Sequence, residues 1–219
     1  MTTKTFLVVG STGLVGEMVV KHLALEGNKV KALSRNNLSS SDPLVENIKV
    51  DFDRLDLYQE HFKQVDGVYI CLGTTISKAG SEEAFKRVDI DYCLETAKQA
   101  LNAGVKNLSL ITSVGADSSS SNFYLRTKGI VENKISQLGF SSLSIHRPGL
   151  LIGPRKEMRL AEFLGQKIQP LINPFLLGNL SKFRSIKAEV LARAMIKCSG
   201  LEQGTHYYFY NDFIEKGSD

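Results

Sequence analysis

The sequence of 219 residues contains no tryptophan and only three cysteines, Cys71, Cys93 and Cys198. These cysteines lie far apart and form no C-x-x-C pair, so neither a disulfide framework nor a zinc site is indicated. The four histidines also lack the spacing of metal ligands. Unpaired cysteines fit a reducing compartment, and we therefore expect a cytoplasmic protein without a bound metal.

Long apolar runs and long basic runs are missing as well. No uninterrupted apolar stretch approaches the roughly 20 residues that a membrane-spanning helix needs. The 27 lysines and arginines are spread among 23 acidic residues, for a net charge of only +4. We therefore expect no membrane span and no nucleic-acid partner. With 42% hydrophobic residues, the chain can bury one substantial core, which predicts a single domain over residues 1–219.

A glycine-rich turn, V-V-G-S-T-G-L-V-G, lies near the start of the chain. Glycines at positions 10, 13 and 16 allow a tight turn, close approach of the backbone to a pyrophosphate, and close packing of the next helix on the strand. The first amides of that helix then form an anion site. The spacing G-x-x-G-x-x-G departs from the common G-x-G-x-x-G, and a turn without any ligand would look alike. The strand before it, the helix after it and a second strand favour dinucleotide binding.

Strands and helices alternate along the first two thirds of the chain. This alternation predicts a doubly wound, mostly parallel α/β sheet of the Rossmann-like type, because successive parallel strands need a helical crossover between them. The predicted strands are Lys4–Val9, Lys29–Leu33, Ile48–Val50, Gly67–Leu72, Asn107–Thr112 and Phe140–His146. One predicted helix begins at Val15, and three others cover Leu55–Gln64, Glu82–Ala103 and Phe123–Leu138.

The last third is less regular. We expect helices at Lys156–Ile168 and Ile186–Cys198 and a final strand at Thr205–Tyr210. Residues 150–185 are expected to form a lid on the substrate side. The apolar segment Leu171–Leu177 fits a pocket wall, a subunit contact or ordinary core packing.

Two strand ends carry candidate cofactor residues, since ligands of open α/β sheets bind at the carboxyl ends of the strands. At the end of the second strand, NAD-selective sites place an acidic residue, whereas here Ser34 and Arg35 occur. A guanidinium suits a 2′-phosphate, which predicts NADP rather than NAD, with NAD the alternative. After the third strand come Asp51 and Phe52, and Phe52 could pack on an adenine or belong to the core.

Tyr124 and Lys128 form a Y-x-x-x-K pair on the predicted helix that follows the fifth strand. Residues four apart project from the same helix face. A tyrosine with an unperturbed pKa near 10 becomes a usable acid or base when an adjacent cation favours its phenolate. Ser113, at the preceding strand end, can donate a hydrogen bond to a substrate carbonyl. Thr112 could take that place if the strand ends one residue earlier.

The motifs GSTGLVG, CLGTTISKAG, FKRVDIDY, TSVGADSSSSNFYLRTKGIVE and HRPGLLIGPR resemble the short-chain dehydrogenase/reductase superfamily, in particular its atypical branch of Tat-interacting-protein-like oxidoreductases. The resemblance covers most of the chain and implies a single Rossmann-like domain that binds NADP or NAD. It implies Ser113, Tyr124 and Lys128 as catalytic residues. Asp89, in RVDIDY, lies where many relatives place an asparagine of a proton relay, so that relay is in doubt here.

The implied reaction is hydride transfer between nicotinamide and a small carbonyl or alcohol substrate, with Tyr124 as acid or base and Lys128 on the nicotinamide ribose. A redox sensor that acts through a protein partner is the alternative, although such a sensor has no chemical need for the Tyr–Lys pair. A sugar epimerase or dehydratase is disfavoured by the short C-terminal part, and a homodimer is left open. The residues expected to hold the cofactor are Gly10, Thr12, Gly13, Leu14, Val15, Ser34, Arg35, Asp51, Phe52, Leu72, Gly73, Thr74, Lys128, Pro148, Gly149 and Leu150.

Overall fold

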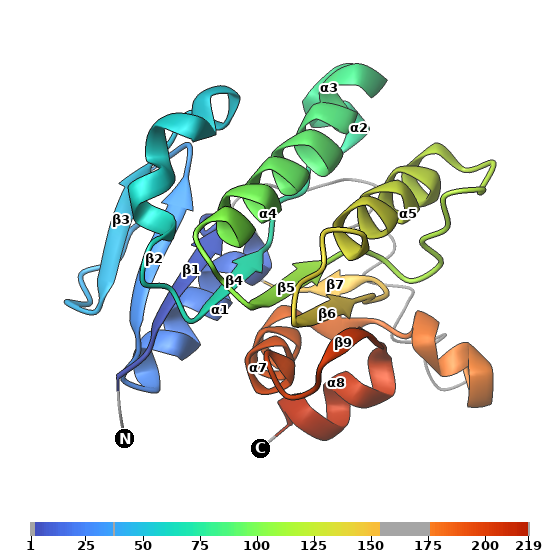
Figure 1. Cartoon of the computed structure of the whole chain (residues 1–219). Coiled ribbons are helices and arrows are strands. Elements are labelled where there is room, and N and C mark those ends of the chain that lie inside the picture. Colours follow the sequence, from blue (N-terminus) through green and yellow to red (C-terminus); the bar gives the residue numbers. More distant parts are fainter. Residues whose placement is uncertain (1–2, 37, 154–175, 219) are drawn as a thin grey trace.

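A parallel sheet of seven strands runs through the part of the chain that the structure describes (Figure 1). The structure is a computed structural model and describes residues 3–36, 38–153 and 176–218. The strand order is β3-β2-β1-β4-β5-β6-β9, and every pairing is parallel. The strands are β1 Thr5–Val9, β2 Lys29–Ser34, β3 Val45–Lys49, β4 Gly67–Ile70, β5 Asn107–Ile111, β6 Ser142–His146 and β9 Gly204–Tyr208.

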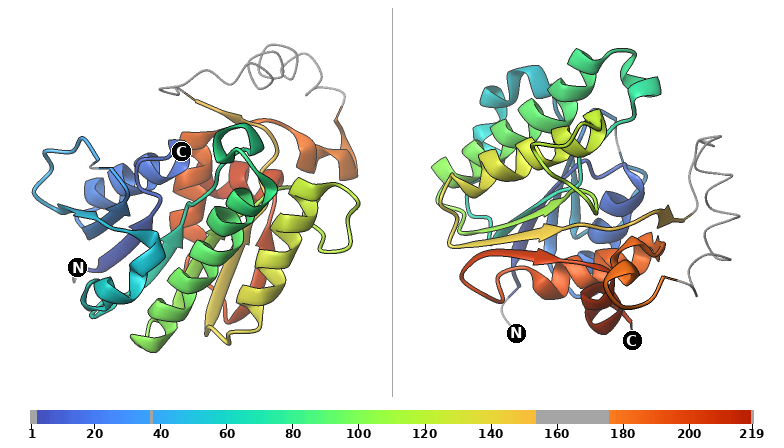
Figure 2. Two further views of the ribbon diagram at one scale, coloured as in Figure 1. Left: turned by 90° about the horizontal axis from the view of Figure 1, so that it is seen from above. Right: turned by 90° about the vertical axis from the view of Figure 1, so that its right-hand side faces the viewer.

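Helices cover both faces of this sheet (Figures 1 and 2). In β1, Leu7 and Val9 belong to one core cluster and Val8 to the other, because successive strand side chains point to opposite faces. A strand buried on both faces must consist mainly of apolar residues, as β4 and the last three residues of β1 do. One face carries η1 Phe52–Phe62, α4 Cys93–Asn102 and α5 Phe123–Ser136, and the other carries α1 Leu14–Leu25, α7 Ala188–Cys198 and α8 Tyr210–Gly217.

The strand order reverses beside β1, and this reversal positions the site. After β1 the chain builds β2 and β3 on one side, and then returns to place β4 on the other side of β1. The connections that leave β1 and β4 therefore diverge at the carboxyl ends of these strands, which is where open α/β sheets bind ligands. The predicted doubly wound, Rossmann-like fold is confirmed.

The predicted helix at Glu82–Ala103 is continuous but changes type along its length. It consists of α3 Glu82–Lys86, the π-helical segment η2 Arg87–Tyr92, and α4, and the short helix α2 Ile76–Ala79 precedes it. Near the C-terminal end, η4 Gly178–Phe183 leads into a second, two-stranded sheet of β7 Leu151–Ile152 and β8 Ile186–Lys187.

Several predicted boundaries were wrong by one to three residues. The third strand begins at Val45 rather than Ile48, because the edge strand β3 pairs with β2 along its whole length although Glu46 and Asn47 are exposed. Ile186 and Lys187 pair as β8, so the helix predicted there begins only at Ala188. The last strand ends at Tyr208, and α8 was not predicted. The predicted helix Lys156–Ile168, most of Leu171–Leu177 and most of the 150–185 lid lie outside the described residues.

We expect the free energy of unfolding to depend on pH, because the imidazole of His146 is buried. Burial lowers the pKa of His146 to about 3, and the ring stacks on Tyr208 with 5.2 Å between centroids. An unfolded histidine titrates near 6.5, so between about pH 6.5 and about pH 3 the unfolded chain binds more protons than the folded one. The free energy of unfolding should therefore fall as the pH drops through this window, by about 2–3 kcal/mol at about pH 4.5.

Urea unfolding of the protein and of His146→Phe at neutral pH and at about pH 4.5 measures this effect. The variant should lose most of the acid destabilisation, whereas His61→Gln, which removes a half-buried imidazole on η1, should retain it. An unchanged loss of stability in His146→Phe would assign the acid sensitivity to other groups.

Candidate functional site

The glycine turn lies between β1 and α1, at the carboxyl edge of the sheet. Gly10 has a φ of +81°, and a Cβ there would lie 2.7 Å from the Cys71 carbonyl oxygen. A Cβ at Gly16 would lie 2.3 Å from the Gly10 carbonyl oxygen, so both positions require glycine. Gly13 is the N-cap of α1 and is exposed. The turn thus presents the first amides of α1 in a cradle without side-chain bulk, which could hold a pyrophosphate.

The other predicted residues of this turn differ in their exposure. Thr12 is exposed, Leu14 is half-buried and Val15 is buried against the core. The hydroxyl of the buried Ser11 donates to the Leu33 carbonyl at 3.3 Å, which ties the turn to the end of β2.

The end of β2 provides an exposed guanidinium. Ser34 is buried, and its hydroxyl donates to the backbone carbonyl of Asn36. The Ser34 hydroxyl therefore stabilises the bend in which the chain leaves the sheet. Arg35 is exposed next to it, and the Gly10 amide bonds the Leu33 carbonyl at 3.0 Å. Arg35 is therefore close in the fold to the glycine turn, and its side chain is exposed.

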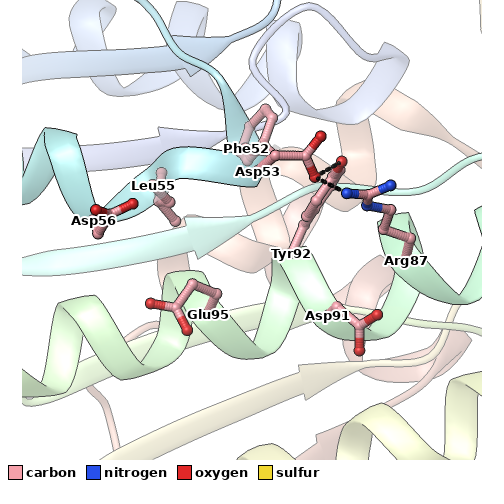
Figure 3. A pocket seen from close by; sticks show the side chains of 8 residues that line it. All are labelled: Phe52, Asp53, Leu55, Asp56, Arg87, Asp91, Tyr92 and Glu95. Atoms are coloured by element: carbon pink, nitrogen blue, oxygen red, sulfur yellow. Dashed lines mark hydrogen bonds and ion pairs between the residues drawn. The ribbon is translucent and has the colours of Figure 1, made fainter.

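The end of β3 leads into a pocket of about 310 Å³ (Figure 3). Phe52 is buried in the core and stacks on Tyr92 with 5.3 Å between ring centroids. Most of the Phe52 ring therefore belongs to the core and is not available to pack on an adenine. Asp51 is exposed and caps η1 by accepting a hydrogen bond from the Asp53 amide. Four carboxylates line the pocket, which makes it unsuited to a phosphate. Its lining residues are Phe52, Asp53, Leu55, Asp56, Arg87, Asp91, Tyr92 and Glu95.

One carboxylate of this pocket, Asp53, has two partners. Asp53 Oδ1 accepts a hydrogen bond from the Tyr92 hydroxyl at 2.6 Å and lies 2.9 Å from the Arg87 guanidinium. Burial, together with this hydrogen bond, raises the pKa of Tyr92 to about 12. Tyr92 therefore stays a neutral donor, and the pocket wall is fixed by side chains from η1 and η2.

Tyr124 and Lys128 share one face of α5, as predicted from their spacing. The Lys128 Nζ lies 5.8 Å from the centre of the Tyr124 ring, and Tyr124 is 37% exposed. The Tyr124 ring meets the edge of buried Phe85. Lys128 is only 6% exposed, and its Nζ lies 2.6 Å from Asp89 Oδ1. Burial alone lowers the pKa of Lys128, but the Asp89 and Tyr124 side chains outweigh it and raise that pKa well above its usual value.

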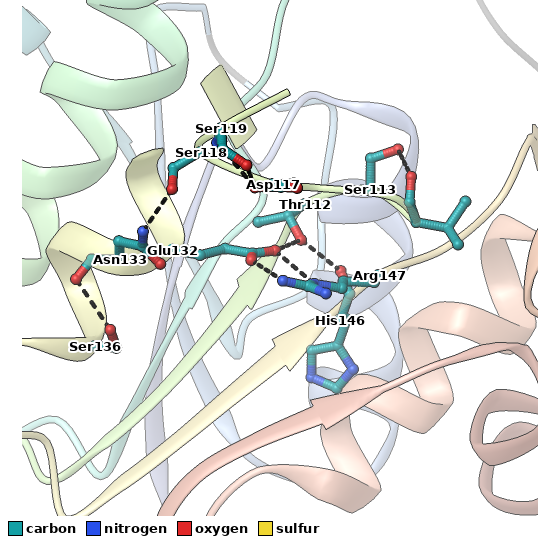
Figure 4. A network of polar contacts seen from close by, with 11 residues as sticks. Thr112, Ser113, Asp117, Ser118, Ser119, Glu132, Asn133, Ser136, His146 and Arg147 are labelled. Carbon is teal, nitrogen blue, oxygen red and sulfur yellow. Dashed lines mark hydrogen bonds and ion pairs between the residues drawn. The ribbon is translucent and has the colours of Figure 1, made fainter. Parts of the chain in front are cut away.

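The two candidate hydroxyls at the end of β5 differ in their surroundings (Figure 4). The Thr112 hydroxyl points into the core and donates to Glu132 Oε1 at 2.6 Å. The half-buried Ser113 hydroxyl has a longer contact, 3.3 Å, with the neighbouring Val114 carbonyl. Ser113 is therefore the hydroxyl that a substrate could reach, whereas the Thr112 hydroxyl is engaged in a contact inside the core.

Glu132 forms a buried junction that the sequence analysis missed (Figure 4). This carboxylate is 1% exposed and pairs with Arg147, whose Nε donates to Oε1 at 3.0 Å. The Arg147 guanidinium also lies 4.5 Å above the Tyr207 ring. Because Glu132 also accepts from Thr112, one carboxylate joins α5 to the ends of β5 and β6. An acidic residue between the buried Val131 and Ile135 is the signal that could have indicated it.

The segment after β6 packs tightly against a distant part of the chain. A Cβ at Gly149 would lie 2.5 Å from the Arg184 carbonyl oxygen. The carbonyl of buried Pro148 accepts the Val114 amide at 2.9 Å, and the Leu150 carbonyl accepts the Ile186 amide. Pro148, Gly149 and Leu150 thus form a wall beside the strand end that carries Ser113.

The segment after β4 faces the Lys128–Asp89 pair from another side. Leu72 and Thr74 are half-buried and Gly73 is exposed. A Cβ at Gly73 would lie 3.7 Å from Asp89 Oδ1 and 3.8 Å from Lys128 Nζ.

In the described ranges, no group of three or more metal-ligating side chains occurs, and no helix is long and apolar enough to cross a membrane.

Comparison with known proteins identifies relatives of this chain. The pattern of the NmrA-like family matches residues 2–151. Protein HTATIP2 of Rattus norvegicus is 39% identical over 172 residues, which cover 76% of this chain and 71% of that protein. Protein FMP52, mitochondrial, of Debaryomyces hansenii is 38% identical, with 73% of each chain covered. The solved structure of MoeE5 with UDP-glucose and NAD superimposes with a TM-score of 0.71 at 16% identity, over 96% of this chain and 80% of that one.

The comparison contradicts the expected cytoplasmic location. Three fungal relatives, from Debaryomyces hansenii, Candida albicans and Scheffersomyces stipitis, are named as mitochondrial proteins. The prediction rested on unpaired cysteines, which indicate only a reducing environment and do not distinguish one such compartment from another.

Proposed function

This chain belongs to the NmrA-like family of atypical short-chain dehydrogenases/reductases, and from that premise we propose that it is an NADP-dependent oxidoreductase. It transfers a hydride between the nicotinamide and a small carbonyl or alcohol substrate. The observation that carries the proposal is the pairing of Tyr124 with a buried, charged Lys128 on one face of α5, with the Lys128 Nζ 5.8 Å from the ring.

The residues of the site fit a dinucleotide. The glycine turn takes the pyrophosphate on the amides at the start of α1, because its exposed N-cap residue, Gly13, has no side chain, and the close backbone packing at Gly10 and Gly16 fixes the turn. Lys128 donates to the hydroxyls of the nicotinamide ribose, and Pro148, Gly149 and Leu150 line the nicotinamide end. Asp51, Leu72, Gly73 and Thr74 complete the cofactor wall. When bound, the nicotinamide supplies or accepts the hydride.

The protein residues handle the proton and the substrate oxygen. Tyr124 gives its hydroxyl proton to the substrate oxygen in reduction and takes it back in oxidation. Ser113 donates a hydrogen bond that orients and polarises this oxygen. Lys128 holds a positive charge 5.8 Å from the centre of the Tyr124 ring, so the proton transfer takes place beside a fixed cation.

Turnover of a panel of aldehydes and ketones with NADPH, and of the matching alcohols with NADP, tests the proposal. We expect consumption of NADPH with at least one class of carbonyl compound. Tight cofactor binding without turnover of any panel member, in either direction, would instead favour a redox sensor that acts through a protein partner. The carboxylate of Asp89, which compensates the charge of Lys128, is the observation that supports this second candidate.

The preference for NADP rests on Arg35, which is exposed at the end of β2 with no acidic residue in the place where NAD-selective sites have one. Arg35→Ala should weaken NADPH binding by about 1.5–3 kcal/mol, the scale of a charge-assisted hydrogen bond, and leave NADH binding nearly unchanged.

Calorimetric titration of both cofactors measures this difference. Arg54→Ala is the matched control, because Arg54 is an exposed arginine on η1 that pairs with Asp56 and should not affect either cofactor. Equal losses for NADPH and NADH in Arg35→Ala, or a wild-type preference for NADH, would show that Arg35 does not contact the 2′-phosphate.

A further inference from the structure

Asp89 is a buried carboxylate beside the site to which the proposed reaction gives no role. It is 1% exposed, and its Oδ1 lies 2.6 Å from Lys128 Nζ. Its second oxygen, Oδ2, accepts a hydrogen bond from the Thr74 amide at 2.9 Å. One side chain therefore joins α5, which carries Lys128, to the segment after β4, which is a proposed wall of the cofactor site.

The π-helical segment η2 presents this carboxylate. A π-turn contains one residue more than an α-helical turn, so it changes the direction of the side chains relative to the α-helices on either side. Only Asp89 and Ile90 are buried among the residues of η2. The wide turn is supported by side chains of α4, since the Cys93 thiol donates to the Val88 carbonyl at 3.6 Å and the Thr96 hydroxyl to the Tyr92 carbonyl at 2.7 Å.

We propose that Asp89 is a positioning residue that holds Lys128 as a fixed ammonium ion against the cofactor wall formed by Gly73 and Thr74. The inference rests on the proposed function, because that function places Lys128 at the nicotinamide ribose. An ammonium group has three N–H donors, so the bond to Asp89 leaves two for ribose hydroxyls. The Thr74 contact fixes the distance between the lysine and the wall, which a lone lysine on a flexible stem would not keep.

Three titratable side chains face Lys128 in the described structure, and they come from three elements. Asp89 lies on η2, Tyr124 on α5 and Cys93 on α4. Burial raises the pKa of the Cys93 thiol to about 12, so it stays neutral and does not replace the carboxylate as a counter-ion. Without Asp89, burial would favour the neutral amine of Lys128.

The Asp89→Asn variant tests this role, and Asp91→Asn is the matched control. Asparagine in place of Asp89 would keep the size of the side chain, but its NH2 group would replace one of the two acceptor oxygens and would face either Lys128 or the Thr74 amide. Asp91 lies two residues on in the same π-segment and is exposed, so its amide variant makes the same change in net charge without touching Lys128. Both proteins are compared with the wild type for folding, cofactor affinity and turnover.

The first measurement needs no activity. Reductive methylation at mildly alkaline pH, mapped by mass spectrometry, reports the neutral amine fraction of Lys128. Each unit by which its pKa falls raises that fraction about tenfold. We expect Lys128 in Asp89→Asn to be modified at least about tenfold faster than in the wild type. In Asp91→Asn, we expect it to be modified at the wild-type rate. Equal rates in all three proteins would overturn the inference, whether or not the protein proves to be an enzyme.

The second measurement is the pH dependence of kcat. In Asp89→Asn, kcat should fall with rising pH through the lowered pKa of Lys128, whereas the wild type and Asp91→Asn should show no such limb. A uniform loss at every pH would overturn the inference. If wild-type protein turns over no substrate, the proposed function fails and the methylation result alone decides the role of Asp89.

Asp89→Asn leaves a buried ammonium without its partner, which can prevent folding. The double variant Asp89→Asn with Lys128→Met removes both charges of the pair. Folding of the double variant when Asp89→Asn alone does not fold would support the inference, because the unpaired Lys128 is then the cause. Failure of both to fold would overturn it in favour of a general structural role for Asp89.

Discussion

The Gly13→Asp variant is expected to fold like the wild type and to lose cofactor binding. Gly13 is the N-cap of α1, with φ −78° and ψ 163°, a conformation that aspartate adopts readily. Aspartate is also a favoured N-cap, so its side chain should stabilise the start of the helix. A Cβ at Gly13 would lie 3.2 Å from the Gly10 carbonyl oxygen, which requires only a small shift.

The same carboxylate would stand at the place where the pyrophosphate is proposed to bind. Two like charges about 4 Å apart repel by about 4 kcal/mol at an effective dielectric constant of about 20. We therefore expect NADPH affinity to fall by at least about a hundredfold, together with loss of turnover. Fluorescence titration with NADPH and thermal unfolding measure the two effects.

Gly13→Asn is the matched control, because asparagine has the same size and is also a good N-cap but carries no charge. It should bind NADPH more tightly than Gly13→Asp does. Unchanged NADPH affinity in Gly13→Asp would show that this turn does not hold the pyrophosphate.

The Tyr124→Phe variant should lose turnover by about 10²–10⁴-fold, the range typical for loss of a general acid. The phenyl ring can keep its edge contact with Phe85 and its place near Lys128, since only the hydroxyl is removed. Cofactor affinity and stability should therefore change little. Steady-state kinetics on a substrate established for the wild type, with NADPH titration of both proteins, separates the chemical step from binding.

Tyr207→Phe provides the control for loss of a tyrosine hydroxyl. Tyr207 lies on β9, is 41% exposed, and its ring lies under the Arg147 guanidinium. Phenylalanine keeps this ring contact, and we expect a normal rate. Wild-type turnover in Tyr124→Phe would remove Tyr124 from the reaction and leave the redox sensor as the better description.

Local patterns in the sequence were sufficient to predict the fold class and the positions of the glycine turn and of the Tyr124–Lys128 pair. An apolar strand, a glycine turn and an amphipathic helix are defined by neighbouring residues, so Gly10, Gly13 and Gly16 could be placed at the strand-to-helix turn without any tertiary information. The pairing of Tyr124 with Lys128 follows from helix geometry alone, because residues one turn apart share a face. The parallel direction of the strands follows from the helical crossovers between them.

The surroundings of these residues were decided only by the tertiary structure. The Lys128–Asp89 and Glu132–Arg147 pairs join residues on separate elements, and the spacing of residues in the sequence does not indicate which buried charges will meet. The assignment of Thr112 to the core follows from its contact with Glu132, 20 residues away. Such contacts depend on how helices pack on the sheet, and packing is determined by the shape of the whole core rather than by any one segment.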